Sequence, residues 1–192
     1  MRKIAFALTV LALTIGLSGV ASAAADNGRS QGSWWFSIDN QLGFTGTSIS
    51  PEKGRDTDSS NFSIGFRPVY FVMDGLGIEP SIAYMSSDIQ GDGLKAQEEI
   101  DYGIGLIYAL QAAGGYPYAG FGWNWSTVEN YYKDDLDINF GEIKAGYIFE
   151  VKPHFGLGGE VFYDFGSGEV DNFDYDITRY GVRVSISGLA YK

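Results

Sequence analysis

The sequence contains no cysteine and a single histidine, His154. Without cysteine the chain can form neither a disulfide nor a thiolate metal site, and it has no cysteine nucleophile. Positive charge is also scarce, because 13 Lys and Arg residues stand against 24 Asp and Glu residues, for a net charge of −11. Nucleic acid needs a basic protein surface, so a chain this acidic is not expected to bind it.

The first 23 residues have the pattern of a bacterial secretory signal peptide. Arg2 and Lys3 form a basic start, residues 4–20 are almost wholly apolar, and residues 21–23 (Ala-Ser-Ala) give a small-residue cleavage site. A retained membrane anchor is the alternative, but the cleavage site favours removal. We therefore expect residues 1–23 to be a signal peptide and residues 24–192 to form one domain, with a net charge of −13 once Arg2 and Lys3 are removed.

After the signal peptide, no apolar run reaches the roughly 20 residues that a transmembrane helix needs. Glycine (27 residues) and aromatic residues (16%) are abundant instead. Several segments alternate strictly: Tyr180, Val182, Val184 and Ile186 share one parity, and polar residues occupy the positions between them. Since successive side chains of a strand point to opposite faces, this pattern predicts a sheet with one apolar and one polar face.

Eight such segments can be placed, and the connectors between them alternate in length. The predicted strands are residues 34–44, 61–71, 76–85, 99–110, 116–126, 137–149, 154–165 and 176–189. The long, polar connectors are 45–60, 86–98, 127–136 and 166–175, and the short ones are 72–75, 111–115 and 150–153. Short periplasmic turns and longer external loops are typical of an all-β, eight-stranded antiparallel up-and-down transmembrane β-barrel with both termini in the periplasm. The long connectors and their flanks hold most of the surplus acid, which predicts four acidic extracellular loops.

Aromatic residues gather near the ends of the predicted lipid-facing parity, where they would form two interfacial girdles. At the periplasmic interface we expect Trp34, Phe36, Tyr108, Tyr147, Phe149 and Phe155. At the outer interface we expect Phe44, Tyr84, Trp123, Trp125, Phe165 and Tyr180.

The opposite parity carries charges of both signs, which are Asp39, Arg67, Glu79, Asp101, Glu142, Lys144, Glu160, Arg179 and Arg183. If the residues that flank each connector pair, Asp39 lies opposite Arg67, Lys144 lies opposite Glu160, and Arg183 lies within one position of Glu160. Closure of the barrel would bring Arg183 near Asp39. The lumen of an eight-stranded barrel is just wide enough for side chains. A buried charge without a partner lowers the stability of the fold by roughly several kcal/mol. The pattern therefore predicts a ring of paired charges that fills the lumen near mid-height. Inward glycines such as Gly65 and Gly103 would leave room for the long cationic side chains.

On these features the chain resembles the small eight-stranded outer-membrane barrels of Gram-negative bacteria, the OmpA/OmpX and opacity-type group. The resemblance covers essentially the whole mature chain. It implies an outer-membrane location, in contact with membrane lipid and lipopolysaccharide, and a structural or surface-interaction role; we expect a monomer. One departure is the C-terminus. Such proteins usually end on an aromatic residue, whereas Tyr191 is penultimate here and off the lipid-facing parity, unless a bulge at Gly188 restores it.

Catalytic and metal sites are weakly supported. Some barrels of this size modify lipids through a histidine, but His154 adjoins a predicted periplasmic turn, and the sequence has no G-x-S-x-G element. Two acidic runs offer oxygen ligands of the kind that Ca²⁺ prefers. These runs, Asp134, Asp135 and Asp137, and Asp171, Asp174 and Asp176, lack EF-hand spacing. We therefore expect solvated loop charge, with no cofactor and no metal.

Three functions remain open at this point. We favour a non-enzymatic barrel with a closed, salt-bridged lumen that presents its acidic loops to an extracellular ligand. The second is a narrow small-solute pore or ligand-carrying barrel, because the inward residues Trp35, Phe71, Ile107 and Phe162 break the polar lumen and could line a pocket. The third, a soluble periplasmic lipocalin-like barrel, would require the aromatic parity to face inward.

Overall fold

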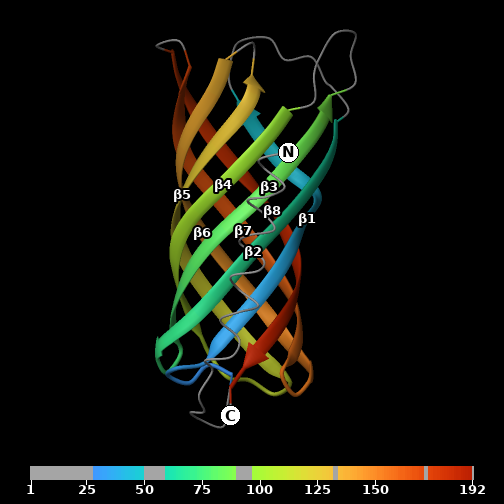
Figure 1. Cartoon of the computed structure of the whole chain (residues 1–192), viewed down its shortest axis with the longest axis vertical. Helices are drawn as coiled ribbons and strands as arrows, with labels where there is room; N and C mark the ends of the chain where they lie inside the picture. Colours follow the sequence, from blue (N-terminus) through green and yellow to red (C-terminus); the bar gives the residue numbers. More distant parts are fainter. Residues whose placement is uncertain (1–27, 50–58, 90–96, 132–133, 171–172, 192) are drawn as a thin grey trace, which may run out of the picture.

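The computed structural model describes residues 28–49, 59–89, 97–131, 134–170 and 173–191, which form a closed barrel of eight antiparallel strands (Figure 1). The strands are β1 (Trp34–Ile49), β2 (Ser59–Met73), β3 (Leu76–Ile89), β4 (Gln97–Ala109), β5 (Gly115–Tyr131), β6 (Asp134–Lys152), β7 (Phe155–Val170) and β8 (Phe173–Ala190). Each strand pairs with its neighbours in sequence, and β8 closes the barrel on β1. The predicted fold class is confirmed. Within the described ranges, no helix has the length and apolarity to cross a membrane.

The strands extend further than predicted at the end opposite the short turns. β5 and β6 stay paired as far as Tyr131 and Asp134, and β7 and β8 as far as Val170 and Phe173. The predicted long connectors at 127–136 and 166–175 are therefore wrong, since most of these residues continue the ladders. These residues are mostly polar, so their sequence lacks the apolar alternation from which strands were predicted. The backbone hydrogen bonds of the ladder continue through them all the same.

The two faces of the wall are sorted by parity. Aliphatic residues of the outer face are open to the surroundings, with Ile104 54% and Ile186 58% exposed. Residues of the other parity are buried in the lumen, including the charged Glu142 and Arg183. This is the reverse of a soluble barrel, so the aromatic parity does not face inward as the lipocalin-like alternative requires.

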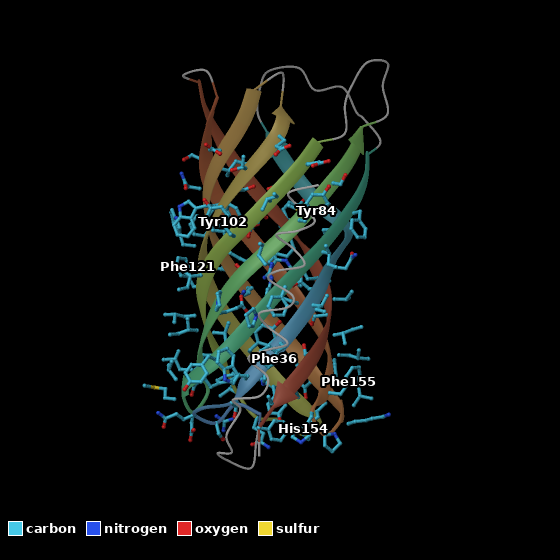
Figure 2. The ribbon with its side chains drawn as sticks, in the orientation of Figure 1. Phe36, Tyr84, Tyr102, Phe121, His154 and Phe155 are labelled. Carbon is cyan, nitrogen blue, oxygen red and sulfur yellow. The ribbon has the colours of Figure 1, made fainter. Side chains whose placement is uncertain are left out.

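The predicted girdle residues whose side chains are described lie on the outer wall. They are Trp34, Phe36, Tyr84, Tyr108, Trp123, Trp125, Tyr147, Phe149, Phe155, Phe165 and Tyr180. Figure 2 shows Phe36 and Phe155 near the end with the short turns, called here the lower end, and Tyr84 and Tyr102 in the upper half. Tyr102, which the prediction omitted, stacks on Trp125 with ring centroids 5.8 Å apart. Phe44 belongs to β1, but its side chain lies outside the described residues.

The chain before β1 crosses the lower end of the barrel. The Gly32 amide donates to the Phe71 carbonyl at 2.8 Å, and the Gly75 amide donates to the Arg29 carbonyl at 2.9 Å. Gly75 has a φ of +80°, a conformation that suits glycine in the tight turn between β2 and β3. These backbone bonds hold residues 28–33 across the mouth that the short turns surround.

An apolar cluster, called here the lower plug, fills the lumen directly above this segment. It consists of Trp35, Val69, Phe71, Ile107, Ala109, Tyr116, Ile148 and Leu189. The rings of Trp35 and Phe71 meet edge to face with centroids 4.7 Å apart, and Phe71 is completely buried. Six of the eight strands contribute a side chain to this cluster, and β3 has Gly77 at this height, where a Cβ would collide with Val69.

Alanine substitutions at two lumen-facing glycines, Gly166 and Gly122, test how closely neighbouring strands pack. A methyl group at Gly166 would collide with the Asn139 carbonyl oxygen and would lie 2.6 Å from the Phe140 Cα, both of which belong to the rigid ladder. At Gly122 the nearest atom would be the Ile104 carbonyl oxygen at 3.5 Å. We expect Gly166→Ala to lower the free energy of unfolding by about 1–3 kcal/mol. Gly122→Ala should leave it unchanged within error. Urea unfolding of the barrel in lipid vesicles measures both; equal effects would contradict this packing.

Candidate functional site: charge clusters in the lumen

Eleven charged side chains of the described residues form ion pairs inside the barrel. The four cations are Arg67, Lys144, Arg179 and Arg183, and the seven carboxylates are Asp39, Glu79, Glu99, Asp101, Glu142, Glu160 and Asp164. All nine residues of the predicted lumen network are among them. They fall into two groups at different heights, so the single ring that the sequence suggested is wrong.

The central cluster contains Arg67, Lys144, Arg183, Asp39, Glu79, Glu142 and Glu160. Glu142 is its hub, because its carboxylate contacts all three cations: Arg183 at 2.5 Å, Lys144 at 3.1 Å and Arg67 at 3.4 Å. Arg183 also donates to Glu160 at 2.7 Å, and Lys144 donates to Glu79. These side chains come from six strands, so the cluster ties opposite walls of the barrel together across the lumen.

The register explains why the predicted partners are only partly right. Asp39 lies opposite Gly65 rather than Arg67, yet the two charges still pair diagonally, with Arg67 Nε 3.0 Å from Asp39 Oδ2. The absence of a side chain at Gly65 makes this possible, since a Cβ there would lie 2.6 Å from the Asp39 carboxylate.

Two further register predictions had different outcomes. Lys144 was expected opposite Glu160 but lies opposite Phe162, because β6 continues to Lys152 and the turn to β7 lies at residues 153–154 rather than at 150–153. Glu160 and Arg183 lie directly opposite each other, one position closer than expected. Across the closing seam, Arg183 lies opposite Gln41, two positions from Asp39, so the two charges are near each other as expected and line the same space.

The upper cluster contains one cation, Arg179, and three carboxylates. The Arg179 guanidinium donates from Nη1 to Glu99 and from Nε to Asp164 at 3.2 Å, and its Nη2 lies 3.5 Å from Asp101. Its Cζ lies 4.2 Å from the centre of the Phe140 ring, which covers one face of the guanidinium. Ser126 donates to the Glu99 carboxylate at 2.7 Å.

Glu99 and Asp164 were not predicted as lumen residues. Glu99 is the first residue of the predicted strand 99–110 and has the same parity as Asp101, but it was not included in the predicted lumen network. Asp164 has the same parity as Glu160 and lies between two outward aromatic residues. Strict extension of the alternation to the strand ends would have identified both.

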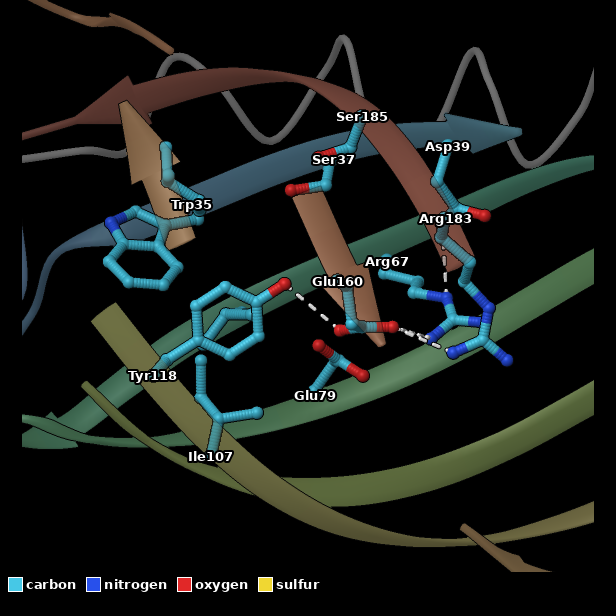
Figure 3. A pocket seen from close by; sticks show the side chains of 12 residues that line it. Trp35, Ser37, Asp39, Arg67, Glu79, Ile107, Tyr118, Glu160, Arg183 and Ser185 are labelled. Carbon is cyan, nitrogen blue, oxygen red and sulfur yellow. Dashed lines mark hydrogen bonds and ion pairs between the residues drawn. The ribbon is translucent and has the colours of Figure 1, made fainter. Parts of the chain in front are cut away.

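A small space separates the lower plug from the central cluster (Figure 3). It has a volume of about 20 Å³, and Trp35, Ile107 and Tyr118 face Glu160 and Arg183 across it. Tyr118 donates to Glu160 at 2.9 Å, which closes one side. A space of this size holds about one water molecule, so it does not form an aqueous channel at this height.

The apolar residues that could have lined a ligand pocket pack against other groups instead. Trp35, Phe71 and Ile107 belong to the lower plug, and Phe162 stacks under the Arg183 guanidinium with the Cζ atom 3.7 Å from its ring centre.

A second polar group lies at the lower end. The hydroxyls of Tyr116 and Tyr191 both donate to the Glu150 carboxylate, and the Tyr191 ring packs on His154. The ladder between β1 and β8 has no bulge at Gly188, so Tyr191 keeps the lumen-facing parity. Burial, together with the hydrogen bond to Glu150, raises the pKa of Tyr191 well above its usual range.

His154 and the acidic runs show no catalytic or metal geometry in the described residues. The His154 Nδ1 lies 2.9 Å from the Leu189 carbonyl, in a turn where its φ is +68°. The part of the chain that the structure describes has no group of three metal-ligating side chains that could hold an ion. Of the two predicted runs, only the Asp137 side chain is described, and it accepts a hydrogen bond from Thr127.

The sequence matches the family described as "Outer membrane protein beta-barrel domain" over residues 9–142. The chain belongs to this family. The protein is therefore an outer-membrane β-barrel, and its apolar outer wall faces lipid. No curated protein sequence matches the chain.

Solved structures share the fold of this outer-membrane barrel. It superposes on the outer membrane protein OprG from Pseudomonas aeruginosa with a TM-score of 0.56 and 15% identity, over 85% of this chain and 98% of that one. Neisserial surface protein A gives a TM-score of 0.53 and 14% identity, over 86% and 99% of the two chains. AlkL, solved by solid-state NMR in lipid bilayers, gives 0.53 and 14%, over 86% and 93%.

Removal of one central cation tests whether the lumen charges act as a unit. Arg183→Ala would leave Glu142 and Glu160 buried beside fewer cations, and loss of one partner of a buried pair costs about 3–5 kcal/mol. We expect a decrease of that size in the free energy of unfolding, measured by urea titration in vesicles. Lys152→Ala, which removes an exposed cation at a turn, is the control and should change it by less than about 0.5 kcal/mol. Similar small effects for both would contradict a coupled cluster.

The lower polar group allows a separate test. Tyr191→Phe removes only the hydroxyl that bonds to Glu150 and keeps the ring against His154. We expect a loss of about 1.5–3 kcal/mol of stability, the range for a hydrogen bond to a charged group. Tyr163→Phe, on the outer wall, is the matched control and should have no effect. Equal stabilities of the two variants would show that the Tyr191 hydroxyl contributes nothing.

Proposed function

We propose that this protein is a non-enzymatic outer-membrane barrel with a closed lumen, and that its role is structural or in surface interaction. The observation that carries the proposal is the filling of the lumen at three successive heights. The lower plug, the central cluster and the upper cluster follow one another along the axis, and side chains in each come from opposite walls. A solute would have to displace ion pairs and packed rings to pass.

The absence of an enzymatic role is supported by the position of the only histidine. His154 faces the Leu189 carbonyl and the Tyr191 ring in the turn at the lower end, and the Tyr191 hydroxyl donates to Glu150. The polar side chains of the lumen are held in ion pairs, and the cavity beside them has space for about one water molecule.

A surface-interaction role is supported by the distribution of acid. The upper ends of the strands and the connectors between them hold most of the surplus negative charge, and Asp137 is exposed there. We propose that this acidic rim meets an extracellular ligand with a basic surface, while the apolar wall contacts membrane lipid and lipopolysaccharide. The barrel would act as a monomer, because the wall presents apolar side chains around its circumference that suit lipid rather than a second protein.

A narrow small-solute pore or ligand-carrying barrel is the second candidate. Its support is the space of about 20 Å³ beneath the central cluster, which apolar side chains such as Trp35 and charged ones such as Glu160 line together. Passage would still require the central cluster to open.

Conductance measurements separate the two candidates. In a planar bilayer, we expect the purified barrel to give no stepwise conductance at neutral pH, because three filled heights block the lumen. A heat-shift gel on the same sample establishes that the barrel is folded. Regular current steps whose size changes in the Arg183→Ala variant would refute the closed-lumen proposal and favour a gated pore.

A further inference from the structure

The upper cluster has more negative charge than its cation can balance. Glu99, Asp101 and Asp164 all contact Arg179, so four ionised groups would leave two uncompensated charges in a wall-enclosed space. The central cluster below offers no relief, since its three cations face four carboxylates. An uncompensated charge in a poorly hydrated site costs several kcal/mol and is commonly neutralised by a proton.

Two of these carboxyls are placed to share a proton. Glu99 and Asp101 are two residues apart on β4, so both side chains point into the lumen, and they contact Nη1 and Nη2 of the same Arg179 guanidinium. The buried Asp101 Oδ1 has no hydrogen-bond partner among the described residues. Two ionised carboxylates have only acceptors and repel each other, whereas one proton between them would allow a strong O–H···O⁻ hydrogen bond.

A third carboxyl shows independently that the cluster has too few hydrogen-bond donors. Asp164 is 1% exposed, and its Oδ1 has no hydrogen-bond partner among the described residues, although Oδ2 accepts from Arg179. Asp164 also lies directly opposite Glu142 in the ladder between β6 and β7, where like charges repel. Donors are therefore lacking in this part of the lumen, and a proton would provide one.

Among the described residues, the groups around Glu99 and Asp101 supply one positive charge. β8 contributes Arg179, β7 contributes Asp164, and β6 contributes Glu142 further down, while Ser126 of β5 donates a neutral hydrogen bond. On the β3 side the directly opposite residues are Ala83 and Met85, which carry no charge.

We propose that the upper cluster is a proton-binding site in which Glu99 and Asp101 share one proton in the folded barrel at neutral pH. A proton suits the site better than a metal ion, because the Arg179 guanidinium occupies the point where the three carboxylates converge. Consistent with this, the described residues contain no set of ligands that could hold a metal. The proposal does not depend on whether the lumen conducts.

The bound proton links stability to pH in a defined direction. In the unfolded chain both carboxyls ionise near about pH 4, so above that pH the folded barrel holds a proton that the unfolded chain does not. Unfolding then releases the proton, and the folding equilibrium weakens by up to about tenfold per pH unit as the pH rises. This contribution is complete at about pH 4 and is lost once the folded barrel itself releases the proton.

Infrared spectroscopy of the full chain in micelles of a detergent without ester groups tests the site directly. The C=O stretch of a protonated carboxyl is resolved from the bands of carboxylates and amides. We expect this stretch in the wild-type barrel at pH 7, where ordinary carboxyls are ionised, and we expect it to disappear at alkaline pH. It should be absent in Asp101→Asn and Glu99→Gln, which replace the acid by an amide of the same shape that can donate the same hydrogen bond.

Asp164→Asn is the matched control, because it removes a neighbouring carboxyl and leaves the pair intact. Its infrared band should persist at pH 7, and its stability should still fall with rising pH, whereas Asp101→Asn should lose that slope. A heat-shift gel confirms that each variant folds. No band in the wild type would overturn the proposal, as would a band that Asp164→Asn removes and Asp101→Asn keeps. A band that responds to Mg²⁺ or a chelator at constant pH would assign the site to a metal ion instead.

Discussion

The structure depends on one constraint: charges enclosed in a narrow lumen must find partners there. Eight strands leave a bore that side chains fill, so water cannot solvate charged groups at mid-height. Arg183 is 4% exposed and contacts two carboxylates and an aromatic ring, and Glu142 contacts three cations. Since these residues come from strands on different sides of the barrel, their pairing joins the walls as a packed core joins the layers of a soluble protein.

The outer wall and the lumen stabilise the barrel through different interactions. The wall gains from lipid contact and has no need to pack against another protein layer, so its aliphatic residues stay exposed in the isolated chain. The lumen has little apolar material outside the lower plug and relies on charge instead. This division explains how a chain without cysteine, with few prolines and with a large acidic surplus specifies a single fold.

The sequence predicts the wall well and the lumen partners poorly, for a physical reason. The alternation of apolar and polar residues can be recognised in each strand on its own. The segment from Tyr180 to Ile186 therefore identifies its outward-facing residues without any information about the neighbouring strands. Register depends on the turns, and a turn at residues 153–154 instead of 150–153 places Lys144 opposite Phe162 rather than Glu160. Strand ends are equally hard to predict, because the ladders continue through polar residues such as Ser86 and Glu98, which lie in a predicted connector. A predicted ion pair can form even where the predicted register is wrong, because a long cationic side chain reaches a diagonal partner, as Arg67 reaches Asp39.

The segment before β1 carries a consequence for the order of assembly. Its backbone partners are Phe71 of β2 and Gly75 of the following turn, and the Gly28 amide donates to the Tyr116 hydroxyl of β5. The bonds to Phe71 and Gly75 continue the pairing of β1 with its neighbour β2, so the first hairpins suffice to form them. The bond from Gly28 to Tyr116 requires β5, which is distant in the sequence. The Gly28 amide proton therefore reports on the meeting of distant strands, whereas the Gly32 amide proton reports on a single hairpin.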